Sequence, residues 1–178
     1  MKLKDKDNQF EYLMYVHVPE NPSTDQVLTT NMMGSYFIAK RFREIWPNLV
    51  YSVVGATSIL LADDNYILPK KDDIKKILKE SLIDMYKYTV HSFDCDDYSL
   101  LAHAFIVQER YKIKKNKLEK KQPWAFGQAW GSKFNGKEVS HAVNICYTQD
   151  EGIIFIEPQT DKIWRANSEQ DKVIFIRM

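Results

Sequence analysis

Two cysteines, four histidines and a cluster of aspartates hold most of the chemistry that this sequence could perform. Cys95 lies in the stretch Phe93-Asp94-Cys95-Asp96-Asp97-Tyr98. Asp94 is a suitable N-cap, and Asp96 and Asp97 would follow in the first helical turn, where carboxylates interact favourably with the helix dipole. A cysteine at a helix start has a lowered thiol pKa and an accessible sulfur. The alternative is a buried, inert cysteine at a well-capped helix.

A cysteine nucleophile needs a base, and the base needs a group that orients it. His141 suits the first role, because it begins a predicted strand whose apolar residues alternate. Glu157 follows sixteen residues later, after a turn and a second predicted strand. If these strands pair as a hairpin, His141 and Glu157 lie near the same end of the pair. Asp161 is the next acidic candidate. Alone, His141 would be interpreted as a half-buried strand histidine and Glu157 as a carboxylate at a sheet end near a turn, but together with Cys95 they favour a catalytic constellation.

The order and spacing of these residues resemble those of the papain-like and transglutaminase-like cysteine peptidases. In that superfamily a Cys opens a helix, a His opens a later strand, and an Asp or Glu follows one hairpin later in a phrase that ends in Pro, as in Ile156-Glu157-Pro158. Over residues 72–178 the chain is most similar to the protease-like C-terminal domain of fungal agglutinins. The resemblance implies Cys95 as nucleophile, His141 as base and Glu157 as orienting residue. It also implies a peptide or protein substrate and a need for calcium or manganese.

Three aspartates, Asp94, Asp96 and Asp97, flank the proposed nucleophile and disfavour its thiolate by charge repulsion. Three carboxylates in four residues are hard oxygen ligands that suit Ca²⁺ or Mn²⁺, and a bound cation would reverse that repulsion. Related agglutinin domains take metal through aspartates next to their cysteine, which implies the same here. The alternative is that the three residues only cap a helix and pair with Lys or Arg. No organic cofactor is expected.

A donor for the oxyanion is harder to identify. Papain-like enzymes place a Gln several residues before the cysteine, whereas residues 89–92 contain none. The candidates are the side chain of Gln128 and the backbone N–H of Cys95. This departure keeps two other functions open: a non-catalytic binding or structural module on the same fold, for example in a phage or virion, and a transglutaminase-like amide transferase.

The elements that must position these side chains follow from periodicity. Apolar spacing predicts helices over residues 26–46, from about 72 to 86, and from about 94 onwards, and leaves 49–61 ambiguous. Alternation and β-branched residues predict strands over 10–18, 124–130, 139–147, 153–157, 162–165 and 173–177. This segregation predicts an α+β fold of the papain-like or transglutaminase-like kind, in which the cysteine helix packs on a C-terminal antiparallel sheet.

Length and composition limit the remaining possibilities. We expect a single domain over residues 1–178, in which 1–70 are a strand and helices of unassigned role and 72–178 are the peptidase-like core. With 25 basic and 24 acidic residues the chain is not a globally basic nucleic-acid binder, and the basic stretch 110–121 is interpreted as a solvated helix end and loop. Neither a membrane-spanning run nor a signal peptide is visible, so a cytoplasmic or virion-associated location is expected. The sequence leaves the oligomeric state open.

Overall fold

The computed structural model describes residues 31–52, 56–112 and 122–178. The predicted strand 10–18, the start of the predicted helix 26–46 and most of the basic stretch 110–121 lie outside the described residues. The described elements are β1 (Met32–Gly34), α2 (Ser35–Ile45), β2 (Ile59–Leu60), β3 (Asn65–Ile67), α3 (Lys71–Ser81), the short 3₁₀ helix η1 (Ile83–Met85), α4 (Cys95–Lys112), β4 (Phe126–Phe134), β5 (Lys137–Thr148), β6 (Gly152–Glu157), β7 (Lys162–Arg165) and β8 (Lys172–Arg177).

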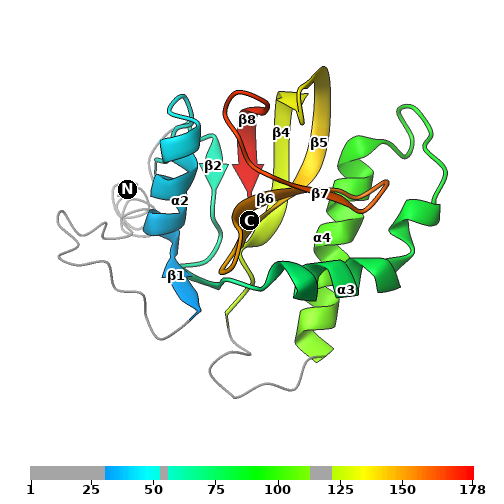
Figure 1. Cartoon of the computed structure of the whole chain (residues 1–178), viewed down its shortest axis with the longest axis horizontal. Coiled ribbons are helices and arrows are strands. Elements are labelled where there is room, and N and C mark those ends of the chain that lie inside the picture. The colour runs from blue at the N-terminus through cyan, green and yellow to red at the C-terminus, as the bar shows by residue number, and fades with distance from the viewer. Residues whose placement is uncertain (1–30, 53–55, 113–121) are drawn as a thin grey trace, which may run out of the picture.

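Six of these strands form one mixed sheet in the order β2-β8-β4-β5-β6-β7 (Figure 1). The four pairs from β8 to β7 are antiparallel, as predicted. The edge pair β2–β8 is parallel, so a purely antiparallel sheet was the wrong expectation there. Strands β1 and β3 form a separate antiparallel pair. The result is an α+β fold of three α-helices and a six-stranded sheet within the described part of the chain.

The helices cover the two faces of the sheet, with α2 on one side and α3 and α4 on the other (Figure 1). Alternation along β5 produces this division, because Val143 and Ile145 point to the α2 side and Cys146 points to the α4 side. The first core joins these α2-side residues to buried side chains of the helix, namely Ile38, Ala39 and Phe42. The second core joins the α4 side to Ile74, Ile77 and Leu78 of α3 and to Tyr98, Ala102 and Ile106 of α4.

Several predicted boundaries are wrong for local reasons. Helix α2 begins only at Ser35, because Met32–Gly34 pair with β3 instead of joining the helix. Helix α3 ends at Ser81, because Leu82 adopts a left-handed conformation with φ of 54°, and the chain continues into η1. Strand β5 begins at Lys137, so His141 lies inside the strand and not at its start.

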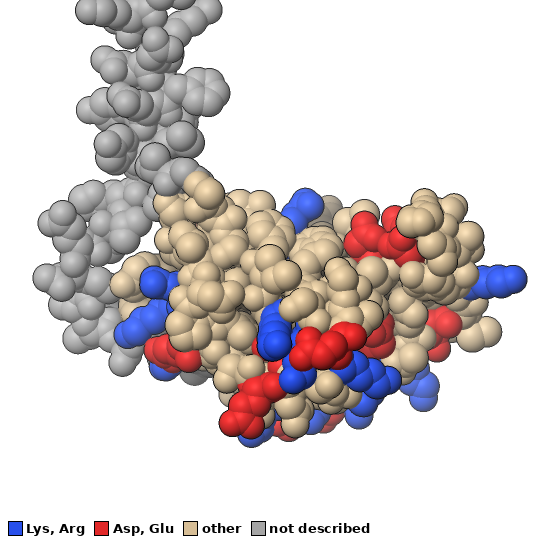
Figure 2. Space-filling view, turned by 90° about the horizontal axis from the view of Figure 1, so that it is seen from above, with Lys and Arg blue, Asp and Glu red and all other residues tan. Residues whose placement is uncertain are grey.

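Charge is distributed without a dominant sign. On the face shown in Figure 2, Lys and Arg side chains alternate with Asp and Glu side chains along one edge of the molecule. This agrees with a formal net charge of +1 for the whole chain. Of the helices in the described ranges, none is both long and apolar enough to cross a bilayer.

Candidate active site

Helix α4 begins at Cys95 because the residues around it form a capping box. The Asp94 carboxylate accepts hydrogen bonds from the backbone N–H groups of His91, at 3.3 Å, and Asp96. In return, the Asp97 carboxylate accepts from the backbone N–H of Asp94 at 3.0 Å. This reciprocal arrangement satisfies donors that an uncapped helix end would leave without partners, and it fixes Cys95 as the first helical residue.

Buried hydrogen bonds attach α4 to the sheet one turn after Cys95. The Ser99 hydroxyl donates to the Val143 carbonyl at 3.2 Å. The Asn144 amide donates to the carbonyl of Ser99 at 2.9 Å and to that of Gly127 at 3.0 Å. One side chain of β5 thereby bridges α4 and β4. These contacts hold the start of α4 in a defined position along β5.

The sulfur of Cys95 lies against the same strand. The backbone N–H of Ala142, the residue after His141, donates a hydrogen bond to the thiol. The pKa of the Cys95 thiol is raised above its usual value, first by burial and then by the nearby Asp94 and Asp96 carboxylates, while the Ala142 hydrogen bond opposes this. Cys95 is half-buried, whereas Cys146 is fully buried in the second core, where burial raises its thiol pKa strongly.

His141 and Glu157 are in direct contact. The distance from His141 Nε2 to Glu157 Oε2 is 2.6 Å. Asn144 pairs with Ile156 in the antiparallel β5–β6 ladder, so Glu157, the residue after Ile156, follows on the side of the ladder where β5 runs back toward His141. Because side chains alternate along each strand, Glu157 and His141 point to the same face of the sheet. A carboxylate only accepts, so Nε2 carries a proton and donates; when the imidazole is neutral, Nδ1 is the acceptor. The Phe134 ring packs against the imidazole in a T-shaped arrangement, with the ring centres 6.3 Å apart.

The other predicted residues are placed differently with respect to this pair. Gln128 is buried on β4 opposite Asn144, whereas Trp130 is the residue opposite Ala142. Asp161 has φ of 53° in the turn after β6 and lines a pocket with side chains of α3, so it lies with α3 and not with His141. Cys95 thus lies beside Ala142, the residue after His141, and His141 lies in contact with Glu157, whereas Asp161 lies away from both.

Two of the three predicted metal ligands are grouped with the thiol. One ligand atom each from Asp94, Cys95 and Asp96 lies within 4.8 Å of the others. The Asp94 and Asp96 carboxyl groups share a hydrogen bond, which lowers the pKa of Asp94 and raises that of Asp96. Two carboxylates this close repel each other when both are charged, and a cation bound between them would relieve that repulsion. The Asp97 carboxylate is not part of this group, and it accepts from the backbone N–H of Asp94.

A pocket of about 380 Å³ opens beside His141 and Glu157. Its walls include the Phe134 and Trp164 rings. The Trp164 indole N–H donates to the buried Asp171 carboxylate at 3.0 Å, which fixes this wall. A substrate group bound in this pocket would lie directly against the imidazole–carboxylate pair.

Sequence reasoning missed the two residues that attach α4 to the sheet, Ser99 and Asn144. Both are fully buried polar side chains. Asn144 interrupts an apolar run between Val143 and Ile145, and a buried amide in such a run must find hydrogen-bond partners. That interruption is the signal by which Asn144 could have been found.

Comparisons with known proteins identify a family and two solved structures of similar fold. The family model named Agglutinin C-terminal matches residues 66–163. The solved structure of a PSL1a–E64 complex has a TM-score of 0.66 and 19% identity, over 84% of this chain and 52% of that chain. Polyporus squamosus lectin bound to the human-type influenza-binding epitope Neu5Aca2-6Galb1-4GlcNAc has a TM-score of 0.66 and 20% identity, over 84% and 50%. The present chain therefore spans about half the length of these proteins. No curated protein matches it.

Proposed function

The chain belongs to the agglutinin C-terminal family, and we propose that it is a papain-like cysteine peptidase or amidase. The observation that carries this proposal is the 2.6 Å contact between His141 and Glu157. The backbone N–H of the next residue on β5, Ala142, donates to the Cys95 sulfur. A second support is the solved complex of PSL1a with E64, which is an inhibitor of cysteine proteases. The same residues would serve a transglutaminase-like amide transfer, in which an amine replaces water.

Each residue has a defined role in this proposal. Cys95 Sγ attacks the carbonyl carbon of the scissile amide while its proton passes to Nδ1 of His141. The resulting imidazolium is stabilised by the Glu157 carboxylate, which already accepts from Nε2. His141 then gives the proton to the leaving amine, and a thioester remains on Cys95. Water, deprotonated by His141, attacks the thioester and releases the acid and the free thiol.

The oxyanion formed in these steps needs donors, and two are proposed. The backbone N–H of Cys95 is at the start of α4, where the first N–H groups have no partner within the helix. Gln128 is the side-chain candidate, but it lies opposite Asn144, two residue pairs along the β4–β5 ladder from Trp130, which faces Ala142. The helix N-terminus is therefore the better placed of the two.

The acidic group beside the thiol fits a hard cation. Asp94 and Asp96 supply carboxylate oxygens that Ca²⁺ and Mn²⁺ prefer, and the close approach of the two carboxyl groups raises the pKa of Asp96. When bound, a divalent cation supplies positive charge that favours the Cys95 thiolate. We propose Asp94 and Asp96 as its protein ligands, and Asp97 as a helix cap.

A hydrolysis assay tests the proposal. The protein is incubated with a denatured protein substrate in buffer containing Ca²⁺ or Mn²⁺, and new amino termini are counted. The unmodified protein should release them, Cys95→Ala should not, and the matched control Cys146→Ala should retain activity if it folds. Equal rates for the unmodified protein and Cys95→Ala would refute the proposal.

A non-catalytic binding module is the second candidate. The observation in its favour is the raised pKa of the Cys95 thiol, because a nucleophilic cysteine is usually shifted the other way. The two candidates differ in the response to cation: the peptidase should gain thiol reactivity when Ca²⁺ or Mn²⁺ is added, whereas a binding module should not.

A further inference from the structure

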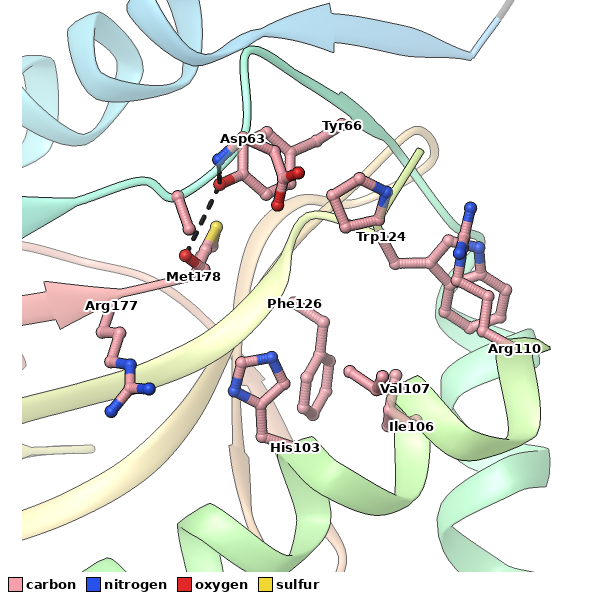
Figure 3. Close-up of a pocket in the computed structure, with 12 residues that line it drawn as sticks. Asp63, Tyr66, His103, Ile106, Val107, Arg110, Trp124, Phe126, Arg177 and Met178 are labelled. Carbon is pink, nitrogen blue, oxygen red and sulfur yellow. Dashed lines mark hydrogen bonds between the residues drawn. The ribbon is translucent and has the colours of Figure 1, made fainter. Parts of the chain in front are cut away.

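A second pocket, of about 300 Å³, lies two turns along α4 from Cys95 (Figure 3). Its walls come from the loop before β3, from α4, and from the adjoining ends of β4 and β8. Neither Cys95, His141 nor Glu157 lines it. The volume is at the lower end of the roughly 300–1,000 Å³ typical of small-molecule sites. This pocket is therefore a binding site candidate distinct from the proposed active site.

Most of the pocket wall is apolar and partly aromatic. The rings of Trp124 and Phe126 and the side chain of Ile106 are buried, and Val107 lies beside them on α4 (Figure 3). The His103 ring packs against Phe126 with ring centres 6.0 Å apart. Flat rings and branched aliphatic groups of this kind favour a planar apolar ligand body.

The charges of the pocket are divided between two sides. Arg110 lies on one side, where burial lowers the pKa of its guanidinium and the nearby Asp63 carboxylate partly opposes that shift. Arg177 lies on the other side, next to His103 (Figure 3). Burial, and then the Arg177 charge, lower the pKa of His103, so the imidazole is neutral and does not add a second charge. Among the described residues, no carboxylate lies within ion-pair distance of Arg177.

From this arrangement we infer that the pocket binds a small aromatic carboxylic acid. The carboxylate would pair with the Arg177 guanidinium, which offers several N–H donors in one plane, and the ring would lie against Phe126 and Trp124. A neutral molecule of the same shape would gain the apolar contacts but leave Arg177 without a counter-charge. The proposed ligand class follows from that difference.

The test compares 2-naphthoate with its neutral counterpart 2-naphthamide by titration calorimetry. The full-length Cys95→Ala protein is used, so that binding is measured independently of any turnover. We expect 2-naphthoate to bind about tenfold more tightly than the amide, the effect of one charge-assisted hydrogen-bonded pair. The carbon-bound hydrogens of the His103 ring should shift in NMR spectra as the acid is added.

Two charge-removing variants localise the effect. Arg177→Gln should abolish the preference for the acid over the amide. Lys172→Gln is the matched control, because Lys172 is an exposed cation on the same strand that does not line the pocket, and it should leave the preference intact. Equal affinity for acid and amide, no binding of the acid, or an equal loss in both variants would overturn the inference. None of these outcomes depends on whether Cys95 is a nucleophile.

Discussion

Glu157 uses its two carboxylate oxygens for different purposes. Oε2 accepts from His141, and Oε1 accepts from the backbone N–H of Gln159 at 3.3 Å. The second bond holds the carboxylate in place when the imidazole changes its charge. Glu157 is thus a positioning residue in the proposed mechanism, whereas His141 moves the proton itself.

This difference predicts an order among three variants. His141→Ala should lower kcat about as much as Cys95→Ala, because the members of such a unit act together. Glu157→Gln should keep part of the activity, since an amide oxygen still accepts from Nε2, and Glu157→Ala should be about tenfold worse than Glu157→Gln. The rates are measured on a denatured protein at equal concentrations of folded variant.

Asp161→Ala is the control for this series. Asp161 lies beside α3, where burial and then Asp84 raise the pKa of its carboxyl group, so its loss should leave kcat unchanged. If Asp161→Ala is inactive while Glu157→Ala is fully active, the orienting residue has been misassigned. Full activity of His141→Ala would contradict the whole constellation.

At the level of elements, the site depends on how α4 is attached to the sheet. Asn144 donates to carbonyls of α4 and β4 at once, and it is fully buried. Asn144→Ala leaves the Ser99 and Gly127 carbonyls without this donor, so the free energy of unfolding should fall by about 1–3 kcal/mol. Denaturant unfolding measures the loss. Ser99→Ala, which removes the single bond to Val143, should cost less; the reverse order would contradict the bridging role of Asn144.

Two glycines allow β4 to pack closely against β8. A Cβ atom at Gly127 would lie 2.0 Å from the Arg177 carbonyl oxygen, and one at Gly131 would lie 2.3 Å from that of Lys172. Because both obstacles are backbone atoms, Gly127→Ala should destabilise the protein by about 3 kcal/mol or more. Gly34→Ala is the matched control, since its nearest neighbour atoms are 3.7 Å away, and it should cost about 1 kcal/mol or less. Similar melting temperatures for the two variants would contradict this packing.

The elements also show what the sequence could and could not predict. The start of α4 was predictable, because Asp94 and Asp97 are capping residues next to an apolar helix. The hairpin that joins His141 to Glu157 followed from two alternating runs around a turn.

Strands β1, β2 and β3 are only two or three residues long, and their pairing depends on partners distant in the sequence. Leu82 gave no signal of its left-handed conformation, which is uncommon for a leucine. Whether Asp97 caps the helix or binds metal could not be decided from spacing alone.

For the whole molecule, a bound cation should appear as added stability. If Ca²⁺ or Mn²⁺ binds Asp94 and Asp96 only in the folded state, an excess of roughly 100 Kd should add about 2.7 kcal/mol, or about 5–10 °C in Tm for a chain of this size. Thermal unfolding with and without a chelator measures the shift. The rise in Tm should vanish in the double variant Asp94→Asn, Asp96→Asn. It should persist in Asp97→Asn, which loses only a helix cap. A Tm that neither cation changes would remove the metal from the proposed function.

If Cys95 is a nucleophile activated by the His141–Glu157 pair, it should react covalently with E64. The unmodified protein is incubated with E64 in cation-containing buffer, and the modified residue is located by peptide mass spectrometry. We expect one adduct per chain, on Cys95, which should be absent in Cys95→Ala and should form much more slowly in His141→Ala. No adduct on Cys95 in the native protein, or labelling of Cys95 at the same rate in His141→Ala, would contradict it.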